Sequence, residues 1–458
     1  MVRVCSGGGI SMASRAALIA GVIVVIALVA AAALVMGGEK TKPAETPPGT
    51  TSPAPSTPAT PAETATETGA AGRREIVLKV GLLVDESGPT SDVGRDYARG
   101  AEAAFKYFNE KGVYTKDGVR VRFEYVKRDY AYNPSKAVEF YREFRDRYGV
   151  VAIVGWGTAD TEKLADQVAK DKVLYISASY SAKLVGKPFN FFPAPDYSTQ
   201  ACAAVKWMAE KKQDARLALL YDHKVAYSKS PIPAIKAYAP EAGVEIVADV
   251  DLPLKATGAD AERAIQQAMG SKPDFLWCGN TIHSCSLAAK ALVKYGLEAV
   301  QVSNVWGFDE RFPQMAGSGV EGKVAGVSPW IWPEYAKDKP GYKEVYEAAK
   351  MMGISEDKVN LRFMQGFMNV WLLVKAIERT TSTELMEKKG EALKEALESS
   401  CQGDPIQLGD ITPPMRFCPG KHLPFTSVYI VVYGEDGKFH FEGPVSPEGF
   451  DCVAATQG

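Results

Sequence analysis

Residues 150–181 read VVAIVGWGTADTEKLADQVAKDKVLYISASYS, and this stretch decides the fold of the chain. Two apolar runs, 150–154 and 173–176, have the length and β-branched content of buried strands, with a helical pattern between them. Small and hydroxyl residues follow the two runs, namely Gly155, Gly157 and Thr158, then Ser177, Ser179 and Ser181. In an open parallel sheet, neighbouring strand ends face one crevice where helix N-termini bind ligands. The pair of strand ends predicts a site for a small polar or anionic ligand, although either loop alone could consist of ordinary turn and capping residues.

The chain from residue 73 onward repeats this alternation of strands and helices over about 385 residues, too many for one hydrophobic core. Expected strands are 76–84, 119–126, 217–221, 244–250, 275–278, 300–303 and 323–327. Expected helices are 93–111, 134–148, 198–211, 233–239, 260–269 and 282–295. The pattern predicts an α/β protein with two lobes and mainly parallel sheets.

A different pattern begins at residue 340. It predicts three helices over 342–351, 359–380 and 384–399, and then a β-hairpin of strands 427–433 and 438–441. A hairpin after long helices indicates that the chain returns to a lobe it had already left.

The N-terminal residues 1–38 have the pattern of a membrane-targeting segment. An uncharged run of 21 residues from Ala16 to Met36 is long enough to span a bilayer, and the flanking charges place the rest of the chain outside the cell. A cleaved signal peptide is the alternative. Residues 39–74 are rich in Thr, Pro and Ala, which predicts a disordered stalk, either O-glycosylated or a plain linker.

The charge and the cysteines limit the function classes. A net charge of −2 without a basic block makes nucleic acid a poor partner. Six of the seven cysteines follow residue 38, an even number that predicts disulfides, and the favoured pairs are Cys401 with Cys418 and Cys278 with Cys285. Cys278, His283 and Cys285 could instead hold zinc, but no paired Cys-x-x-Cys supports that interpretation. Because no catalytic triad, Walker sequence or paired acid and base is present, an enzyme is not expected.

Several phrases, in one order along residues 76–443, resemble the branched-chain amino acid branch of the type I periplasmic binding proteins, the extracytoplasmic receptors of ABC importers. The matching residues are Gly81 with Ser87-Gly88-Pro89, Asn133-Pro134, Val151 to Gly155, Ile176 to Ser181, Phe191 to Tyr197, Ala218 to Asp222 with Tyr227, Lys272 to Phe275 and Gly317 to Gly326.

The resemblance implies two Rossmann-like lobes joined by three crossing strands, which close over a ligand like a hinged trap. Lobe 1 would comprise residues 75–196 and 329–424, lobe 2 residues 197–328 and 425–445, and a tail 446–458 would follow. It implies a monomeric receptor anchored on the extracytoplasmic face, with an ABC permease and ATPase as partners and no cofactor or metal. A ligand-sensing domain of a signalling system with the same fold is the alternative.

The resemblance also implies the ligand contacts. The ligand's carboxylate would lie on Gly157, Thr158, Ala159 and Ser181, with Tyr180 contributing backbone groups and Ser87 nearby. Tyr227, Asn280 and Thr281 would contact the ligand from lobe 2.

Trp306 occupies the region where amino-acid binders of this branch carry an acid for the ammonium group. Asp309 or Asp160 could serve instead, because a buried ammonium without a carboxylate is costly. Trp156, Tyr180 and Phe308 make the expected site more aromatic than usual for the branch. The predicted ligand is an apolar amino acid, or a carboxylate or amide without an ammonium group.

Overall fold

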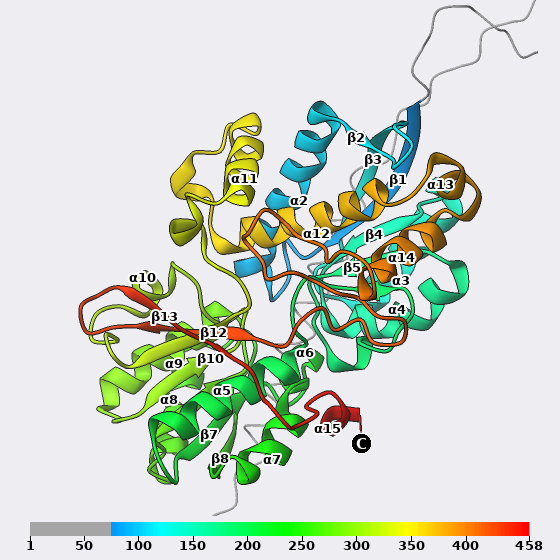
Figure 1. Cartoon of the computed structure of the whole chain (residues 1–458). Helices are drawn as coiled ribbons and strands as arrows, with labels where there is room; N and C mark the ends of the chain where they lie inside the picture. The colour runs from blue at the N-terminus through cyan, green and yellow to red at the C-terminus, as the bar shows by residue number, and fades with distance from the viewer. Residues whose placement is uncertain (1–74, 458) are drawn as a thin grey trace, which may run out of the picture. The chain divides into compact units, whose positions relative to one another are not determined.

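The computed structural model describes residues 75–457, which form two sheets with helices around them (Figure 1). The first sheet has the strand order β2-β3-β1-β4-β5-β6, and the second has the order β13-β12-β11-β10-β9-β7-β8. The strands of the first sheet are β1 (Glu75–Val84), β2 (Val113–Tyr114), β3 (Arg120–Asp129), β4 (Ala152–Gly155), β5 (Leu174–Ser177) and β6 (Asn190–Phe191). Those of the second are β7 (Arg216–Tyr221), β8 (Glu245–Asp251), β9 (Phe275–Cys278), β10 (Val300–Ser303), β11 (Val324–Ser328), β12 (Val428–Tyr433) and β13 (Phe439–Val445).

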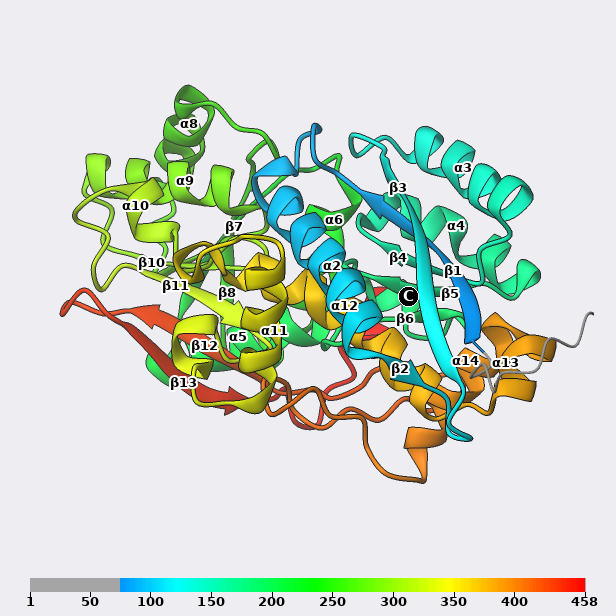
Figure 2. The same ribbon diagram turned by 90° about the horizontal axis from the view of Figure 1, so that it is seen from above.

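Two groups of helices accompany the two sheets (Figures 1 and 2). We call the first sheet and its helices the first lobe, and the second sheet and its helices the second lobe. The helices of the first lobe are α2 (Ser91–Lys111), α3 (Pro134–Glu143), α4 (Thr158–Asp171), α11 (Pro340–Met351), α12 (Leu361–Glu378), α13 (Ser382–Lys388) and α14 (Gly390–Glu398). Those of the second are α5 (Tyr197–Lys211), α6 (Ala226–Lys229), α7 (Ile232–Glu241), α8 (Gly258–Met269), α9 (Ile282–Tyr295), α10 (Phe312–Ala316) and α15 (Ala454–Gln457).

Both sheets are mainly parallel, as the alternation of strands and helices predicts. In the first lobe β1 pairs in parallel with β3 and β4, and β4 pairs in parallel with β5. Every residue of β4 and β5 is buried, because helices cover both faces of a parallel sheet. These two strands belong to the stretch 150–181, which therefore forms the centre of the first lobe.

The chain returns to the second lobe at its end, as the late hairpin predicts. Strand β12 pairs antiparallel with β11 and with β13, which extends the second sheet at one edge. The chain thus passes between the sheets three times: after β6, after β11 and before β12. A two-lobed α/β fold with three connections follows from this topology.

The helices α2 and α12 approach each other closely because glycines lie at their crossing. A Cβ atom on Gly100 would lie 1.9 Å from the carbonyl oxygen of Phe363, and one on Gly366 would lie 1.9 Å from that of Tyr97. Any larger residue at these positions would push the helices apart.

Some elements differ from the sequence prediction. The helix expected over 384–399 is divided into α13 and α14 at Lys389, whose φ is +54°. The break brings Gly390 so close to the start of β5 that a Cβ atom would lie 2.2 Å from the carbonyl oxygen of Lys172. The elements β2, β6, α6 and α10 were not predicted, because two to five residues are too few to show a periodicity.

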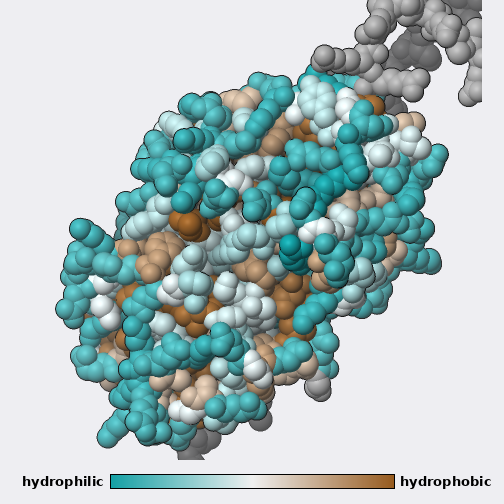
Figure 3. Space-filling model, viewed as in Figure 1, coloured by the Kyte–Doolittle hydropathy of each residue, from teal (hydrophilic) through white to brown (hydrophobic). Residues whose placement is uncertain are grey.

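The expected anchor 1–38 and stalk 39–74 lie outside the described residues. From residue 75 to 457, no helix combines the length and hydrophobicity that crossing a bilayer requires. The face in Figure 3 is mostly hydrophilic, with hydrophobic areas between the hydrophilic ones.

Candidate functional site

A small cavity lies between the two lobes, at the carboxyl ends of the parallel strands. The first lobe lines it with Thr90, Tyr132, Trp156, Gly157, Thr158 and Ala178, and the second lobe with Tyr197, Tyr227, Thr281 and Trp306. The cavity among these residues has a volume of about 20 Å³, room for about one water molecule. Most of the lining residues lie in the segments that come after strands β1, β3, β4 and β5 of the first sheet and β7, β9 and β10 of the second. Strand ends face the crevice of an open α/β sheet, so the position of the cavity agrees with the topology.

The structure brings five of the ten predicted ligand contacts together at this cavity. They are Gly157, Thr158, Tyr227, Thr281 and Trp306. Trp156, which the sequence places in an aromatic site, is also part of the lining. Predicted contacts from both lobes therefore lie at the cavity.

The other five predicted contacts, Ser87, Ala159, Tyr180, Ser181 and Asn280, lie outside the lining. Tyr180 is fully buried and packs against Trp306 with its ring centroid at 5.9 Å, so it supports a lining residue from behind. Ser181 donates its hydroxyl hydrogen to Glu162 at 2.6 Å. The side chain of Asn280 points into the second lobe, where its Nδ2 donates to the carbonyl oxygen of Leu252 at 2.8 Å.

Four lining residues, Thr90, Tyr132, Ala178 and Tyr197, were missed from the sequence. Three of them follow a strand of the first sheet, which is the signal that could have found them. Tyr197 is different, because it is the first residue of α5 and comes directly after the chain leaves the first lobe. No local pattern indicates that its ring reaches the cavity.

Aromatic rings form most of the cavity wall. The rings of Trp156 and Trp306, one from each lobe, meet edge to face with centroids 4.9 Å apart. Tyr197 and Tyr227 meet in the same way at 5.4 Å. The Nε1 of Trp306 donates to the Tyr197 hydroxyl at 3.1 Å. Aromatic pairs in this geometry pack an apolar, well-defined surface, which suits a compact apolar ligand body.

A polar network holds the wall on the second lobe. The Tyr227 hydroxyl donates to Asn304 Oδ1 and lies 3.2 Å from the Asn280 carbonyl oxygen. The backbone N–H of Trp306 donates to the same Asn304 oxygen at 3.1 Å. The side-chain amide of Asn304 thus orients two of the three aromatic residues of this lobe that line the cavity, Tyr227 and Trp306.

Two helices, one from each lobe, begin at the cavity. Gly157 is the N-cap of α4 and Thr281 is the N-cap of α9, and neither of these two residues makes a side-chain capping hydrogen bond. At α9 the Asp92 carboxylate of the first lobe accepts the backbone N–H of His283 at 3.0 Å, so this N-terminus already holds an acidic side chain of the protein. A helix N-terminus presents unpaired N–H groups and a partial positive charge, both of which favour an anion. Each of the two helices has 14 residues, long enough for this effect.

Asp160 and Asp309 were the predicted partners for a ligand ammonium, and neither lines the cavity. Asp309 accepts hydrogen bonds from Arg311 at 2.7 Å and from Arg362 at 3.0 Å, and both Asp309 and Arg362 are 0% exposed. Burial acts to raise the pKa of Asp309, but the two guanidinium groups outweigh it and lower the pKa below its usual value. This carboxylate is already neutralised by the protein.

Asp160 lies behind Gly157 and accepts a hydrogen bond from the Tyr130 hydroxyl at 2.9 Å. Burial raises the pKa of Asp160 to about 7, and the nearby charge of Asp85 acts in the same direction. The carboxyl group of Asp160 is therefore only partly ionised at neutral pH.

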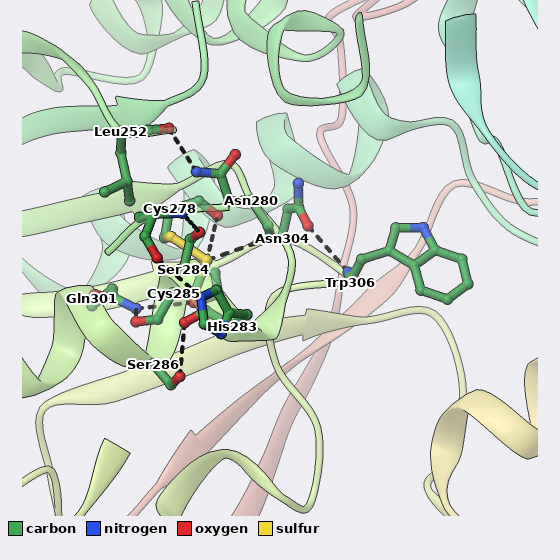
Figure 4. Close-up of a disulfide and its surroundings, with 12 residues drawn as sticks. Leu252, Cys278, Asn280, His283, Ser284, Cys285, Ser286, Gln301, Asn304 and Trp306 are labelled. Carbon is green, nitrogen blue, oxygen red and sulfur yellow. Dashed lines mark hydrogen bonds between the residues drawn. A yellow bond between two sulfur atoms is a disulfide. The ribbon is translucent and has the colours of Figure 1, made fainter. Parts of the chain in front are cut away.

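A disulfide between Cys278 and Cys285 supports the loop that carries Asn280 and Thr281 (Figure 4). It joins the end of β9 to the first turn of α9, with the two Cα atoms 5.8 Å apart. The backbone N–H of Asn304 donates to the Cys278 carbonyl oxygen at 3.1 Å, which connects the loop to the Trp306 segment.

Both favoured cysteine pairs occur in the structure, since Cys401 is joined to Cys418 as well. The third disulfide joins Cys202 to Cys452, which are 250 residues apart in the sequence. The zinc interpretation of Cys278, His283 and Cys285 is wrong, because the two cysteines are bonded to each other. Among residues 75–457 no group of His, Cys, Asp or Glu side chains could hold a metal ion.

The chain is similar to proteins of a known family. A model of the family described as periplasmic binding protein matches residues 77–438. A structure described as an ABC transporter substrate-binding protein from Aeropyrum pernix is 58% identical, with 83% of this chain and 99% of that chain covered and a TM-score of 0.81. No curated protein sequence matches the chain significantly.

Two more distant structures share the fold. A branched-chain amino acid ABC transporter protein from Thermus thermophilus with bound valine is 20% identical, covers 82% of this chain and 98% of its own, and has a TM-score of 0.74. A solute-binding protein from R. palustris in complex with 4-hydroxybenzoate is 19% identical, covers 81% and 96%, and has a TM-score of 0.66.

Proposed function

The chain belongs to the periplasmic binding protein family, and from this membership we propose that it traps a small amino acid, or a related carboxylate or amide, between its two lobes. It is a substrate-binding protein of an ABC transporter, and this family binds solutes and has no enzymatic activity. Delivery of the ligand to a permease, and tethering of the receptor to the extracytoplasmic face by residues 1–38, complete the proposal.

One observation carries the ligand-trapping role: residues of both lobes line the same cavity. Tyr227, Thr281 and Trp306 of the second lobe meet Gly157 and Thr158 of the first lobe there. A ligand that touches both lobes stabilises their closed arrangement, which is how a hinged receptor couples binding to a change of shape.

The chemistry of the cavity supports the ligand class. The cavity has a volume of about 20 Å³, room for about one water molecule, so the lobes have to move apart to admit a ligand. Valine and 4-hydroxybenzoate, found in the two distant structures, are both small carboxylates with an apolar body. The N-terminus of α4, which has no side-chain cap from Gly157, supplies donors for a carboxylate or an amide oxygen.

Titration calorimetry of the full-length chain with a panel of amino acids, small carboxylates and amides tests the proposal. We expect one member to bind with a stoichiometry of one. Replacing Tyr227 by Ala removes an aromatic wall of the cavity and should weaken that binding at least tenfold. Tyr114→Ala is the matched control, because Tyr114 is exposed on the edge strand β2 and should leave the affinity unchanged. Binding of no panel member, or equal effects of the two variants, would contradict the proposal.

A further inference from the structure

We propose that Asp92 and Glu310 form a proton-coupled latch between the two lobes, which favours the closed arrangement at low pH and releases it as the pH rises. The latch rests on the hinged closing of the proposed function and adds a control of that motion. The observations that carry it are two reciprocal contacts between the lobes, a buried oxygen without a partner at each contact, and the charges around them.

Each lobe contributes one carboxylate that binds the first turn of a helix in the other lobe. Asp92, in the first turn of α2 in the first lobe, accepts the backbone N–H of His283 in α9 at 3.0 Å. Glu310, in the second lobe, accepts the backbone N–H of Leu361, the first residue of α12, at 2.7 Å. An N–H group in the first turn of a helix has no acceptor within its own helix, so each of these two depends on the opposite lobe.

Both carboxylates are bound on one side only. The Oδ1 of Asp92 and the Oε2 of Glu310 are buried and have no hydrogen-bond partner among the described residues. Neither carboxylate has the ion pairs of Asp309, which contacts both Arg311 and Arg362. Burial of a carboxyl group is more costly in its charged form than in its protonated form. Closing of the lobes therefore favours the protonated form of both groups.

The surroundings of Glu310 oppose its ionisation on balance. Burial is the main cause that raises the pKa of Glu310 above its usual value, and the neighbouring charge of Asp309 acts in the same direction. Arg362 of α12 acts against them but does not outweigh them. Arg311 and Tyr342 of α11 also face Glu310, and burial raises the pKa of Tyr342, so this hydroxyl is neutral.

Asp92 has a similar balance of causes. Burial raises the pKa of Asp92 above its usual value. The backbone N–H and the ring of His283 and the Thr281 hydroxyl act in the opposite direction, as does Arg311, without reversing the shift. The guanidinium of Arg311 donates to the backbone carbonyl oxygen of Asp92 at 3.1 Å and to the Asp96 carboxylate at 3.3 Å. The Asp92 carboxylate itself therefore stays without an arginine partner.

The direction of the pH effect follows from these shifts. When the lobes part, both carboxyl groups return to water and to their usual pKa values. The closed arrangement thus holds more protons than the open one at pH values above those usual values. Its extra stability is complete at low pH and is lost as the pH rises through the raised pKa values. Asp309 adds nothing between pH 5 and pH 8, because its lowered pKa keeps it ionised in both arrangements.

Hydrogen exchange of the full-length chain without ligand, followed residue by residue by mass spectrometry, tests the latch. We expect the N–H groups of His283 and Leu361 to exchange at least about tenfold more slowly at pH 5 than at pH 8, after correction for the intrinsic rate at each pH. A pKa difference of one unit at one carboxyl group changes the closing equilibrium about tenfold. The Phe363 N–H is the internal control, because it is bonded to Asn360 within the first lobe at 3.0 Å and its corrected rate should stay the same. Corrected rates of His283 and Leu361 that are equal at both pH values would overturn the latch.

Two double variants separate these acids from general effects of pH. Asp92→Asn with Glu310→Gln retains both acceptors and cannot ionise, so the corrected rates of the two N–H groups should differ less than about threefold between pH 5 and pH 8. Asp166→Asn with Glu298→Gln is the matched control, because these side chains, one from each lobe, are 87% and 85% exposed, and it should keep the full pH dependence. Melting temperatures verify that both double variants are folded. A pH dependence as large in the first variant as in the control would overturn the role of the two acids.

The latch and the ligand-trapping role can fail separately. Calorimetry shows whether the chain binds a ligand, whereas hydrogen exchange follows the closing of the lobes without one. Binding of a panel member together with pH-independent exchange would overturn the latch and leave the proposed function standing. Exchange that depends on pH as expected, without binding of any panel member, would support the latch and contradict the proposed function.

Discussion

Asp160 shows how a single residue can be essential to the shape of the site without contacting the cavity. It occupies the first turn of α4 and is buried behind Gly157. The backbone N–H of Gly157 donates to the Tyr130 hydroxyl at 3.0 Å, and that hydroxyl donates to Asp160 at 2.9 Å. The carboxyl group thus fixes the turn on which the cavity's first-lobe wall depends. Burying this carboxyl group is unfavourable, because the second oxygen of Asp160 has no hydrogen-bond partner among the described residues.

The raised pKa of Asp160 predicts a pH-dependent stability. The groups that face it are Tyr130, Tyr132 and Tyr175, which are neutral, and Asp85, which disfavours its ionisation. Between the usual pKa of 3.8 and the folded value of about 7, the folded chain holds a proton that the unfolded chain releases. The stability contributed by this proton is therefore complete at low pH and is lost as the pH rises to about 7.

We expect Asp160→Asn to change the free energy of unfolding little at pH 4 and to increase it at pH 8, by a difference on the order of 4 kcal/mol. The asparagine still accepts the Tyr130 hydroxyl hydrogen, so the geometry is retained. Urea denaturation of both proteins at the two pH values measures the effect. If the free energy of unfolding depended on pH in the same way for both proteins, the pKa of Asp160 would not be raised in the folded chain.

At the scale of elements, the loop between β9 and α9 is the most heavily supported part of the site. The Cys278–Cys285 disulfide closes it, and the Sγ of Cys285 lies 3.4 Å from the Asn280 carbonyl oxygen. Hydrogen bonds of the Asn280 side chain with Ser228, at 2.7 Å, and with Leu252, at 2.8 Å, connect the loop to its neighbours. These contacts leave Thr281 facing the cavity. A rigid loop presents its donors without an entropic cost at the moment of binding.

Removing each of two disulfides in turn shows whether a disulfide supports the ligand site or only the fold, because both close short loops. Their cysteines are 7 residues apart for Cys278–Cys285 and 17 for Cys401–Cys418. Loop closure alone gives roughly 2.5 and 3 kcal/mol of stability, respectively. We expect double alanine variants of both pairs to lose comparable stability, measured by urea denaturation. Only the first should lose ligand affinity, by about tenfold in calorimetry. Equal losses of affinity would mean that the Cys278–Cys285 bond supports the fold alone.

At the scale of the whole described part, direct contacts join the two lobes around the cavity. The hydrogen bonds that join them include His283 N–H to Asp92 at 3.0 Å, Arg311 to Asp96 at 3.3 Å, Arg362 to Asp309 at 3.0 Å and Leu361 N–H to Glu310 at 2.7 Å. When the lobes close on a ligand, these contacts and the contacts of the ligand together stabilise the closed arrangement. Ligand affinity therefore depends on residues that never touch the ligand.

Asp96→Ala tests this dependence, because Asp96 contacts Arg311 across the lobes and lies outside the cavity lining. We expect ligand affinity to fall two- to fivefold, the effect of a partly exposed ion pair. Small-angle X-ray scattering should also show a larger radius of gyration without ligand. The control is Asp166→Ala, which breaks an exposed pair with Lys187 inside the first lobe. A change of affinity as large in the control as in Asp96→Ala would exclude a specific role for the contact between lobes.

The sequence by itself determined the fold class and the loops that form the site. The alternation of short apolar runs with helical stretches predicts parallel α/β lobes, since only strands buried on both faces read as unbroken apolar runs. The turn at Gly157 and Thr158 was identified because strand ends of such sheets face a common crevice, whereas the segment at Thr281 was identified from the resemblance to a known family.

Only the tertiary structure decided which side chain of each loop reaches the cavity. The loops that follow the strands have no fixed alternation of side chains. Ala178 lines the cavity while Tyr180 packs behind it, and Thr281 lines the cavity while the side chain of Asn280 is hydrogen-bonded within the second lobe. Tyr197 reaches the site through packing between lobes, and Cys202 meets Cys452 across 250 residues of sequence. Such contacts are non-local, because they depend on the relative placement of whole elements, and no periodicity along the chain records that placement.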